Sequence, residues 1–235
     1  VGQPTQIAAE VPYEVDVPDH VGPYPIKNRS LRFAVHAAGQ ALDAAGLTPD
    51  AEDPRRRAVI LATGIGSASL QLFGPLALEM FGHLDSADKE DVAPFYAEMA
   101  RRADVQMFDD YYLDLACPVL ATMAGAGQAY NPASACASGG HTLAEGLRMI
   151  RRGEADVVLA GGAGTPTTRT MIPGFAMLKA LSRRNDDPAG ASRPFDAGRD
   201  GFVMGEGAAT LVLEELEHAR ARGANILGEL LGAGV

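Results

Sequence analysis

The sequence predicts an α/β fold organised around a parallel sheet that is buried on both faces. Strands are predicted at residues 58–62, which form an unbroken apolar run, and at the largely apolar residues 155–160 and 208–213. Helical apolar spacing is found at residues 31–45, 142–151 and 214–222. Apolar runs without polar alternation are typical of strands covered on both sides. Because strands and helices alternate along the chain, parallel pairing is favoured.

The helix predicted at residues 31–45 has recognisable ends. Ser30 is expected to cap its N-terminus, and Gly46 is expected to end it at the position that glycine prefers. We expect one closely packed face, made of Phe33, Ala37, Ala41 and Ala44. A further buried helix is predicted at residues 118–126, with Pro118 tolerated in its first turn.

The remaining stretches have weaker patterns. Residues 1–25 lack a clear period and are predicted as an irregular lead-in. Further predictions are a small-residue strand that enters Cys136 after the Asn131-Pro132 break, a glycine-rich turn at 161–164 and another strand at 226–235. Amphipathic helices are candidates between residues 67 and 114, in an order that the pattern does not assign.

The composition restricts the classes of function. Twenty Lys and Arg against thirty Asp and Glu give a formal net charge of -10, which argues against nucleic acid or an anionic membrane as the partner. The chain shows no signal-like start and no long uninterrupted apolar segment. Its two cysteines are Cys117 and Cys136, so we predict a cytoplasmic protein with reduced thiols.

One cysteine stands at a predicted bend between a strand and a helix. Small residues lead into Cys136, Gly139 and Gly140 follow it, and helical spacing begins at Thr142. Unpaired amides at a helix N-terminus favour the thiolate, which is the nucleophilic form. Small neighbours leave room for a substrate to reach the sulfur. These residues indicate a catalytic nucleophile, and the alternative is a buried cysteine that packs as a small hydrophobe.

The chain offers little for a cofactor. The Gly64-Ile65-Gly66 turn follows a predicted strand, but Ser69 stands where a dinucleotide fingerprint has its third glycine. No Lys-Ser or Lys-Thr pair follows the glycines at 161–164. The cysteines and histidines are too scattered for a zinc spacing. We therefore predict no cofactor and no metal.

His141 is the histidine closest in sequence to Cys136. Five residues of helix turn through about 500°, so the imidazole is expected to project from a different side of the helix than the thiol. We predict a packing or polar-contact role for His141. His218 lies in a charged helix and is predicted on a solvated face. The partners of the nucleophile are not identified by these patterns.

A set of linked motifs extends from the cysteine to the end of the chain. The motifs are Ala135-Cys136-Ala137-Ser138-Gly139, Asp156 to Gly162, Gly174-Phe175, Ala180-Leu181-Ser182, Asn185-Asp186, Ser192 to Asp196 and Arg199 to Ala208. In order and spacing they resemble the β-ketoacyl-acyl carrier protein synthases, the condensing enzymes of fatty acid and polyketide synthesis. The likeness covers residues 131–235 and reaches back, more weakly, to the helix after Ser30.

The resemblance implies a thiolase-like layered α-β-α-β-α fold made of two similar halves, of which this chain has the N-terminal half. It implies one N-terminal ketosynthase domain at residues 1–235, incomplete at both ends. It also implies that Cys136 takes an acyl group from a carrier-protein thioester, and that a malonyl-carrier protein then loses carbon dioxide and condenses with it. The Cys136 N–H is implied in an oxyanion hole, and Phe175 and Phe202 near the acyl pocket and the active site.

The implied partners are an acyl carrier protein and a second ketosynthase chain, in a homodimer or a heterodimer. Docking an acidic carrier then requires a local basic patch or basic residues in the missing half of the fold. The family's two active-site histidines and its lysine lie in the second half of the fold and have no counterpart in this chain. Two alternatives therefore stay open: a thiolase-fold acyltransferase that uses Cys136 without decarboxylation, and a non-catalytic ketosynthase-like subunit or fragment.

Overall fold

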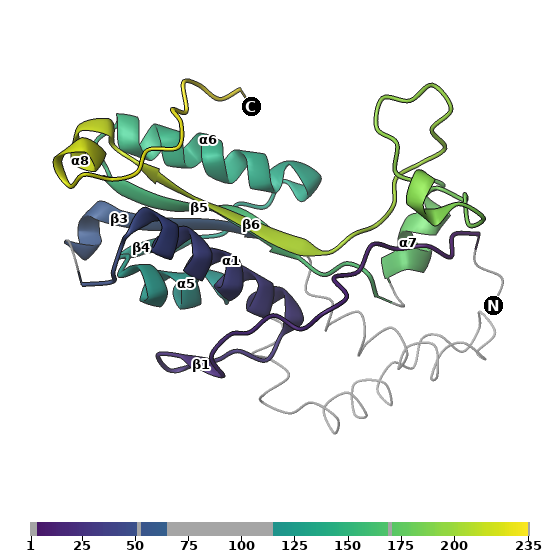
Figure 1. Cartoon of the computed structure of the whole chain (residues 1–235), viewed down its shortest axis with the longest axis horizontal. Helices are drawn as coiled ribbons and strands as arrows, with labels where there is room; N and C mark the ends of the chain where they lie inside the picture. The colour runs from purple at the N-terminus through teal and green to yellow at the C-terminus, as the bar shows by residue number, and fades with distance from the viewer. Residues whose placement is uncertain (1–3, 51–52, 65–114, 169–170, 235) are drawn as a thin grey trace, which may run out of the picture. The chain divides into compact units, whose positions relative to one another are not determined.

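The computed structural model describes residues 4–50, 53–64, 115–168 and 171–234 (Figure 1). The chain divides into two compact units: the sheet unit is Tyr13–Ile65, Leu113–Gly164 and Gly207–Val235, and the α7 unit is Val1–Pro12, Gly66–Tyr112 and Thr165–Glu206. The helices predicted between residues 67 and 114 lie outside the described residues. Within the described ranges, no helix combines the length and the apolar character that a membrane crossing needs.

The sheet unit is built on a mixed sheet. Its strands are β3 (Arg57–Thr63), β4 (Gln128–Tyr130), β5 (Val157–Gly164) and β6 (Gly207–Glu214), in the order β4-β3-β5-β6. β3 is parallel to both of its neighbours, as predicted, but β6 is antiparallel to β5. The expectation of an all-parallel sheet is wrong at β6, because the chain leaves β5 at Gly164 and re-enters opposite it, at Gly207.

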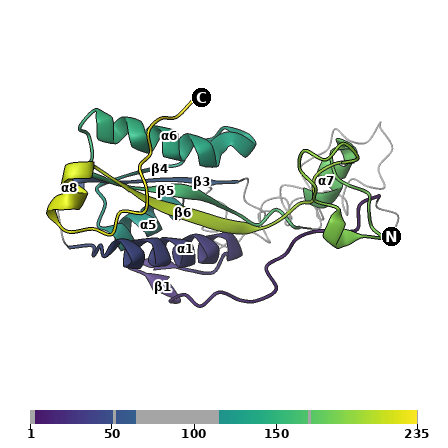
Figure 2. The same ribbon diagram turned by 45° about the horizontal axis from the view of Figure 1, so that its top comes forward.

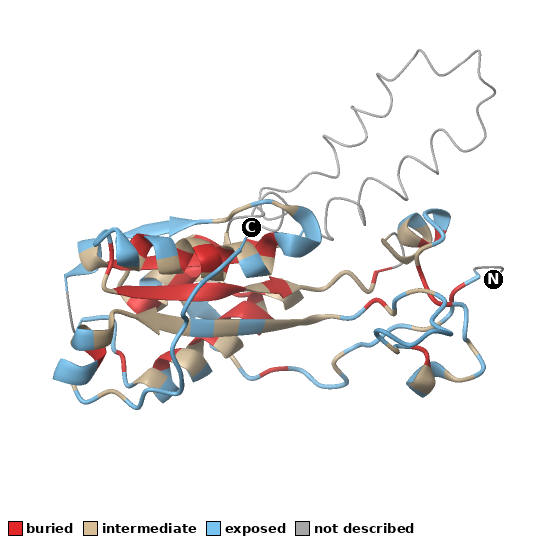
Figure 3. Ribbon diagram, turned by 90° about the horizontal axis from the view of Figure 1, so that it is seen from above, coloured by how far each residue is buried: buried red, intermediate tan, exposed pale blue. Residues whose placement is uncertain are grey.

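Helices cover both faces of this sheet. α1 (Arg29–Ala45) and α5 (Ala116–Ala124) pack on one face, and α6 (Ser138–Arg151) covers the other (Figure 2). Side chains of β3 alternate between the two cores: Val59 and Leu61 join the α1 and α5 side, whereas Ile60 joins the α6 side. The prediction of strands buried on both faces is confirmed for β3. Figure 3 shows the buried residues, in red, concentrated along the central strands.

Shorter elements complete the described residues. The sheet unit adds β1 (His20–Val21) and β2 (Tyr24–Pro25), an antiparallel pair, the 3-10 turns η1 (Pro54–Arg56) and η2 (Ala135–Ala137), and α8 (Leu216–Ala221). The α7 unit contains α7 (Met171–Met177) and the 3-10 turn η3 (Pro188–Gly190). The predicted strand at 226–235 is wrong: residues 224–234 form no regular structure, and Leu227 is 89% exposed, because none of the described strands pairs with them.

α1 begins earlier than predicted. Asn28, rather than Ser30, is the N-cap, and its side-chain oxygen accepts hydrogen bonds from the N–H groups of Ser30 and Leu31 at 2.8 and 3.3 Å. Gly46 ends the helix with φ +65°, as predicted. The buried face is also different from the predicted one: Ala44 is exposed. The buried residues of α1 are Leu31, Phe33, Ala34, Val35, Ala38 and Leu42.

The glycines at 161–164 belong to β5, and the predicted turn is wrong. A Cβ at Gly161 would lie 2.1 Å from the carbonyl oxygen of Ala209 on β6. The two backbones therefore approach to a distance that only glycine permits. Gly146 has the same role on α6, where a Cβ would lie 2.9 Å from Leu213 and 3.2 Å from Val158. Glycine in this region is thus required by packing rather than by a change of chain direction.

The last helix carries a charged cluster that is half-buried. His218 Nδ1 lies 2.6 Å from Glu214 Oε1, and Arg222 donates to both oxygens of the same carboxylate. Burial would raise the pKa of the Glu214 carboxyl, but the hydrogen bonds from Arg222 and His218 outweigh it and lower that pKa. Arg222 also donates to the carbonyl of Ala45, at the end of α1. The prediction that His218 lies on a solvated face is wrong, because this cluster holds the imidazole against β6.

We expect Gly161→Ala to lower the free energy of unfolding by about 3 kcal/mol, because overpacking between two backbones forces them apart. The matched control is Gly140→Ala on α6, where an added Cβ meets no atom within 4 Å. The control is expected to keep or raise the stability, since alanine favours a helix over glycine by about 1 kcal/mol. Chemical unfolding of both variants checks this, and equal stabilities would contradict the proposed close approach of β5 and β6.

Candidate active site

The turn that carries Cys136 links β4 to α6. β4 ends at Tyr130, η2 follows at Ala135–Ala137, and α6 begins at Ser138. The strand predicted immediately before Cys136 is therefore wrong, because the strand lies ahead of Pro132, which has no N–H group to donate to a sheet. The helix after the cysteine is confirmed, and it starts four residues earlier than predicted, at Ser138 rather than residue 142. Cys136 thus lies in a tight turn at a helix entrance.

The two cysteines have opposite surroundings. Cys136 is exposed, which contradicts the alternative of a buried cysteine that packs as a small hydrophobe. Cys117 is 2% exposed, and its Sγ lies 3.7 Å from the carbonyl oxygen of Leu61 in the core. Both are free thiols. Of the two sulfurs, only that of Cys136 is accessible to a substrate on the described surface.

Hydrogen bonds fix the backbone on both sides of Cys136. Ser138 Oγ donates to the carbonyl of Ala135 at 2.7 Å and accepts the N–H of Ser134 at 2.8 Å. The N–H of Ala137 donates to the carbonyl of Ser134 at 3.2 Å. Ala135 has φ +51°, a left-handed conformation that is disfavoured for residues with a Cβ. The turn therefore holds its strained residue directly before the candidate nucleophile.

The first turn of α6 is open beside this cysteine. Its N-cap, Ala137, makes no side-chain cap hydrogen bond. A Cβ added at Gly139 or Gly140 would meet nothing within 4 Å, so space is open over both glycines. Backbone N–H groups at a helix start are donors that stabilise negative charge. This geometry suits the oxyanion of an acyl-transfer intermediate formed at Cys136.

His141 contacts Ser134 rather than the thiol. Its Nδ1 lies 2.6 Å from Ser134 Oγ. The predicted polar-contact role for His141 is therefore confirmed. The roles of Ser134 and Ser138 were not predicted from the sequence, although a serine two residues to each side of Cys136 was the available signal.

The two candidate aromatic residues lie together in the α7 unit. The rings of Phe175 and Phe202 meet edge to face, with centroids 5.9 Å apart and an interplanar angle of 81°. Phe175 belongs to α7, and Phe202 is brought beside it by a parallel bridge to Leu181. Beside the pair lies a small core of Ala176, Leu181 and Met204. Cys136 belongs to the sheet unit, whereas the two phenylalanines belong to the α7 unit.

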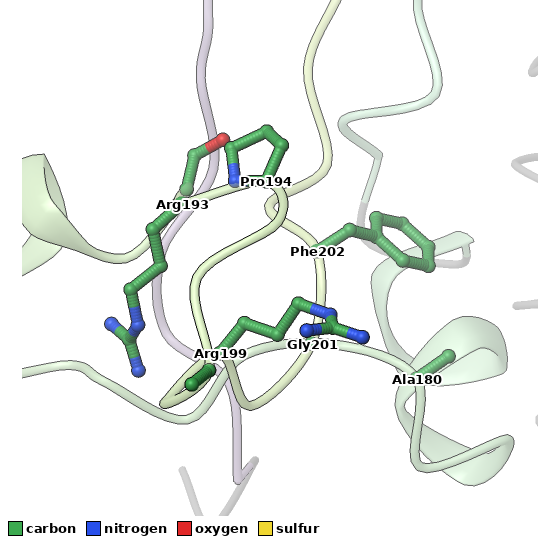
Figure 4. A pocket seen from close by; sticks show the side chains of 8 residues that line it. Ala180, Arg193, Pro194, Arg199, Gly201 and Phe202 are labelled. Carbon is green, nitrogen blue, oxygen red and sulfur yellow. The ribbon is translucent and has the colours of Figure 1, made fainter.

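Phe202 also lines a cavity of about 580 Å³ within the α7 unit (Figure 4). Phe202 is 45% exposed, so much of its ring is accessible. Figure 4 shows the side chains of Arg193 and Arg199 extending in different directions around the cavity. The lining residues are Ala180, Ser192, Arg193, Pro194, Ala197, Arg199, Gly201 and Phe202.

Asp200 holds the loop that forms this cavity. Its carboxylate accepts hydrogen bonds from the N–H of Arg183 at 2.9 Å, from Ser182 Oγ at 2.8 Å and from Arg193 at 3.2 Å. The Arg183 N–H and then the Ser182 hydroxyl lower the pKa of Asp200, so the carboxylate stays ionised in neutral solution. Sequence reasoning placed Asp200 in a motif without a role, because its partners lie at the far end of the loop.

In the part of the chain that the structure describes, no three His, Cys, Asp or Glu side chains gather as a metal site would require. The described groups around Cys136 are its thiol, backbone amides, the hydroxyl groups of Ser134 and Ser138, and the imidazole of His141.

We expect Asp200→Ala to make the loop at residues 183–199 several-fold more sensitive to trypsin, because three donors lose their acceptor. Asp186→Ala is the matched control, since Asp186 lies on the same loop, is exposed and makes no side-chain hydrogen bond to a described residue. Cleavage rates at Arg183 and Arg184, followed by mass spectrometry, provide the measurement. Equal rates for both variants would show that Asp200 does not hold the loop.

Comparisons with known proteins agree with these features. Residues 27–219 match the family described as Beta-ketoacyl synthase, N-terminal domain. The chain is 38% identical over 206 residues to 3-oxoacyl-[acyl-carrier-protein] synthase 2 of Vibrio harveyi, an alignment that covers 87% of this chain and 46% of the relative. The chain thus spans about half the length of the curated relatives it matches.

Two solved structures share the fold. One is a type II polyketide synthase acyl-carrier protein in complex with its ketosynthase bound to the hexaketide, with a TM-score of 0.75, 29% identity, and coverage of 96% of this chain and 50% of that one. The other is the ishigamide ketosynthase/chain length factor, with a TM-score of 0.76, 31% identity, and coverage of 98% and 52%. The expected layered α/β fold is thus confirmed for the half that this chain matches.

Proposed function

We propose that Cys136 accepts the acyl group in a carbon–carbon bond-forming synthase, since this chain belongs to the β-ketoacyl synthase family through its N-terminal domain. The observation that carries the proposal is an exposed thiol on a hydrogen-bonded turn at the open start of α6. In the first step, the Cys136 thiolate attacks the carbonyl carbon of an acyl thioester. The carrier's thiolate leaves and takes a proton, and a new thioester forms at Sγ.

Backbone amides stabilise the intermediate of that step. The attacked carbonyl oxygen becomes an oxyanion, and the N–H groups of Cys136 and of the first turn of α6 are the donors nearest to the reacting sulfur in sequence. The absence of a side-chain cap at Ala137 and the open space over Gly139 support this role. One donor of this kind contributes roughly a hundredfold or more to the rate of acyl transfer.

In the second step, a malonyl group on the carrier loses carbon dioxide, and its α-carbon attacks the acyl carbonyl held on Cys136. The Cys136 thiolate then leaves, and a β-ketoacyl thioester remains on the carrier. Among the described residues, no histidine or lysine is hydrogen-bonded to the Cys136 sulfur, since His141 contacts Ser134. The groups that promote decarboxylation therefore come from outside the described residues or from a second chain. The Phe175 and Phe202 pair is proposed to line the path of the acyl chain.

A carrier protein is the proposed acyl donor. One structural relative was solved with its carrier protein, and the family resemblance implies an acidic carrier. Lys179 and Arg183 are exposed in the α7 unit and make no ion pair with a described carboxylate, so their charges are available to a partner. Although the whole chain carries a net charge of -10, these two exposed cations are the positions that we propose to contact the carrier.

Two other functions remain distinguishable. A thiolase-fold acyltransferase would acylate Cys136 and transfer the group without releasing carbon dioxide. A non-catalytic subunit would not acylate at all, and the open cysteine turn argues against it. Incubation with a malonyl-carrier thioester after acylation, with carbon dioxide measured, separates a condensing enzyme from a simple acyltransferase.

Incubation with an acyl-carrier thioester is expected to add one acyl mass to the chain, as measured by intact-mass spectrometry. Cys136→Ala removes the nucleophile and is expected to abolish the adduct. Cys117→Ala is the matched control and is expected to keep it, because the Cys117 thiol is buried in the core. An adduct that persists in Cys136→Ala, or no adduct on the wild-type chain with its partner chain present, would contradict the proposal.

Charge reversal at Lys179 and Arg183 is expected to slow acylation from the carrier thioester about fivefold, because exposed charges at an interface act mainly on the association rate. Acylation from a small N-acetylcysteamine thioester, which has no carrier surface, is expected to be unchanged. Lys27→Glu is the charge control, since Lys27 is an exposed residue of the sheet unit. Equal slowing with both donors would place the defect in the chemistry or the fold rather than in carrier docking.

A further inference from the structure

The turn around Cys136 is closed by a side-chain network that extends into α6. Ser134 makes three contacts with this network: its N–H donates to Ser138 Oγ at 2.8 Å, its Oγ donates to Ser138 Oγ at 3.4 Å, and the same Oγ lies 2.6 Å from His141 Nδ1. Ser138 and His141 are three residues apart on α6, so their side chains lie on the same face of the helix. One face of α6 therefore holds Ser134, the residue that begins the turn, through hydrogen bonds.

These contacts restrain a segment of backbone whose dihedral angles are disfavoured. Ala135 has φ +51°, which is disfavoured for a residue with a Cβ, and Ser134 itself has φ -136° and ψ 39°, outside the regular regions. Such conformations persist only where the surroundings over-determine them, and they cluster at functional sites. The serine backbone bonds hold one side of the turn. The His141 contact adds a restraint on the Ser134 side chain that the backbone bonds do not supply.

We infer that His141 is a positioning residue, which acts through Ser134 to keep the turn in the one conformation that presents the Cys136 thiol. The inference rests on the proposed role of Cys136 as the nucleophile. The histidine does not touch the sulfur in this arrangement. It restrains Ser134, Ser134 restrains the strained residue after it, and the thiol follows one residue later. Without the contact, the turn samples conformations in which the thiol is turned away.

The rate constant for alkylation of Cys136 by iodoacetamide measures this presentation directly. His141→Leu and Ser134→Ala each remove the contact, and each is expected to lower the rate about threefold to tenfold, in line with the loss of one part-buried hydrogen bond. His141→Asn keeps a polar atom near the Nδ1 position and is expected to restore the rate to within about twofold of wild type. The double variant is expected to be no slower than Ser134→Ala alone, because Ser134→Ala already removes the His141 contact together with the contact between Ser134 Oγ and Ser138 Oγ.

The measurement uses intact-mass spectrometry of the whole chain with any partner it has, and thermal unfolding of each variant in parallel. The buried Cys117 does not compete, and Cys136→Ala shows the background. Alkylation of His141→Leu and Ser134→Ala at the wild-type rate or faster would overturn the inference. Failure of His141→Asn to restore the rate, or effects that multiply in the double variant, would also overturn it. Ser134→Ala keeps the test decisive if the leucine variant unfolds.

Alkylation needs no acyl donor, so this result is independent of the proposed function. If the rates follow the expected pattern but no acyl adduct forms, the positioning network stands and the acyl-transfer function fails. If an acyl adduct forms but the alkylation rates do not change, the function stands and the role of His141 fails.

Discussion

The close packing of α6 against β5 is the constraint on which the candidate site depends. Gly146 lets the helix approach Val158 closely, and Thr142 Oγ1, which is fully buried, lies 3.1 Å from the carbonyl oxygen of Gly161. A helix fixed at such points cannot slide or rotate without losing the contact. Since the Cys136 turn is continuous with the first turn of α6, the position of the thiol follows from this packing.

An ion pair and the candidate active site lie at opposite ends of the parallel strands. Arg56 and Asp156 stand just before β3 and β5, and their ion pair joins the starts of the two parallel strands. Hydrogen bonding to Arg56 lowers the pKa of Asp156, which keeps the pair ionised. At the opposite ends, Asn131 Nδ2 donates to Thr63 Oγ1 at 2.8 Å and ties the exit of β4 to the end of β3. The Cys136 turn begins there, at the carboxyl edge, where parallel sheets commonly place their ligands.

The sequence predicted features that depend on neighbouring residues, and it missed features that depend on residues far along the chain. β3 was predicted because a run of apolar residues needs no knowledge of its partners, and Gly46 because a helix end is a local event. The glycines of β5 were misread as a turn, because the atom that requires Gly161 is the carbonyl of Ala209, far along the chain. The N-cap was assigned to Ser30 instead of Asn28, because both residue types cap helices well. The choice between them depends on where the helix starts, and it starts at Arg29.

The same distinction applies to the candidate site. The exposure of Cys136 followed from its small neighbours, and the polar contact of His141 from helical geometry. The family resemblance implied only that Phe175 and Phe202 lie near the acyl pocket and the active site, and the contact between their rings was not predicted. The acceptor role of Asp200 depends on a loop that closes on itself, and no local pattern encodes that closure. The roles of the three site residues and the single domain at 1–235 stay predictions.

The position of His141 limits what this helix can contribute to catalysis. A helical period of about 3.6 residues aligns His141 with Ser138, and Cys136 precedes the helix, outside that alignment. The imidazole therefore holds the turn through Ser134 and is not directed at the sulfur. Proton transfer during a condensation then requires other groups, whereas presentation of the thiol requires only α6 and its turn. The two tasks are physically separable, so under the proposed function the groups that drive decarboxylation do not have to lie on α6.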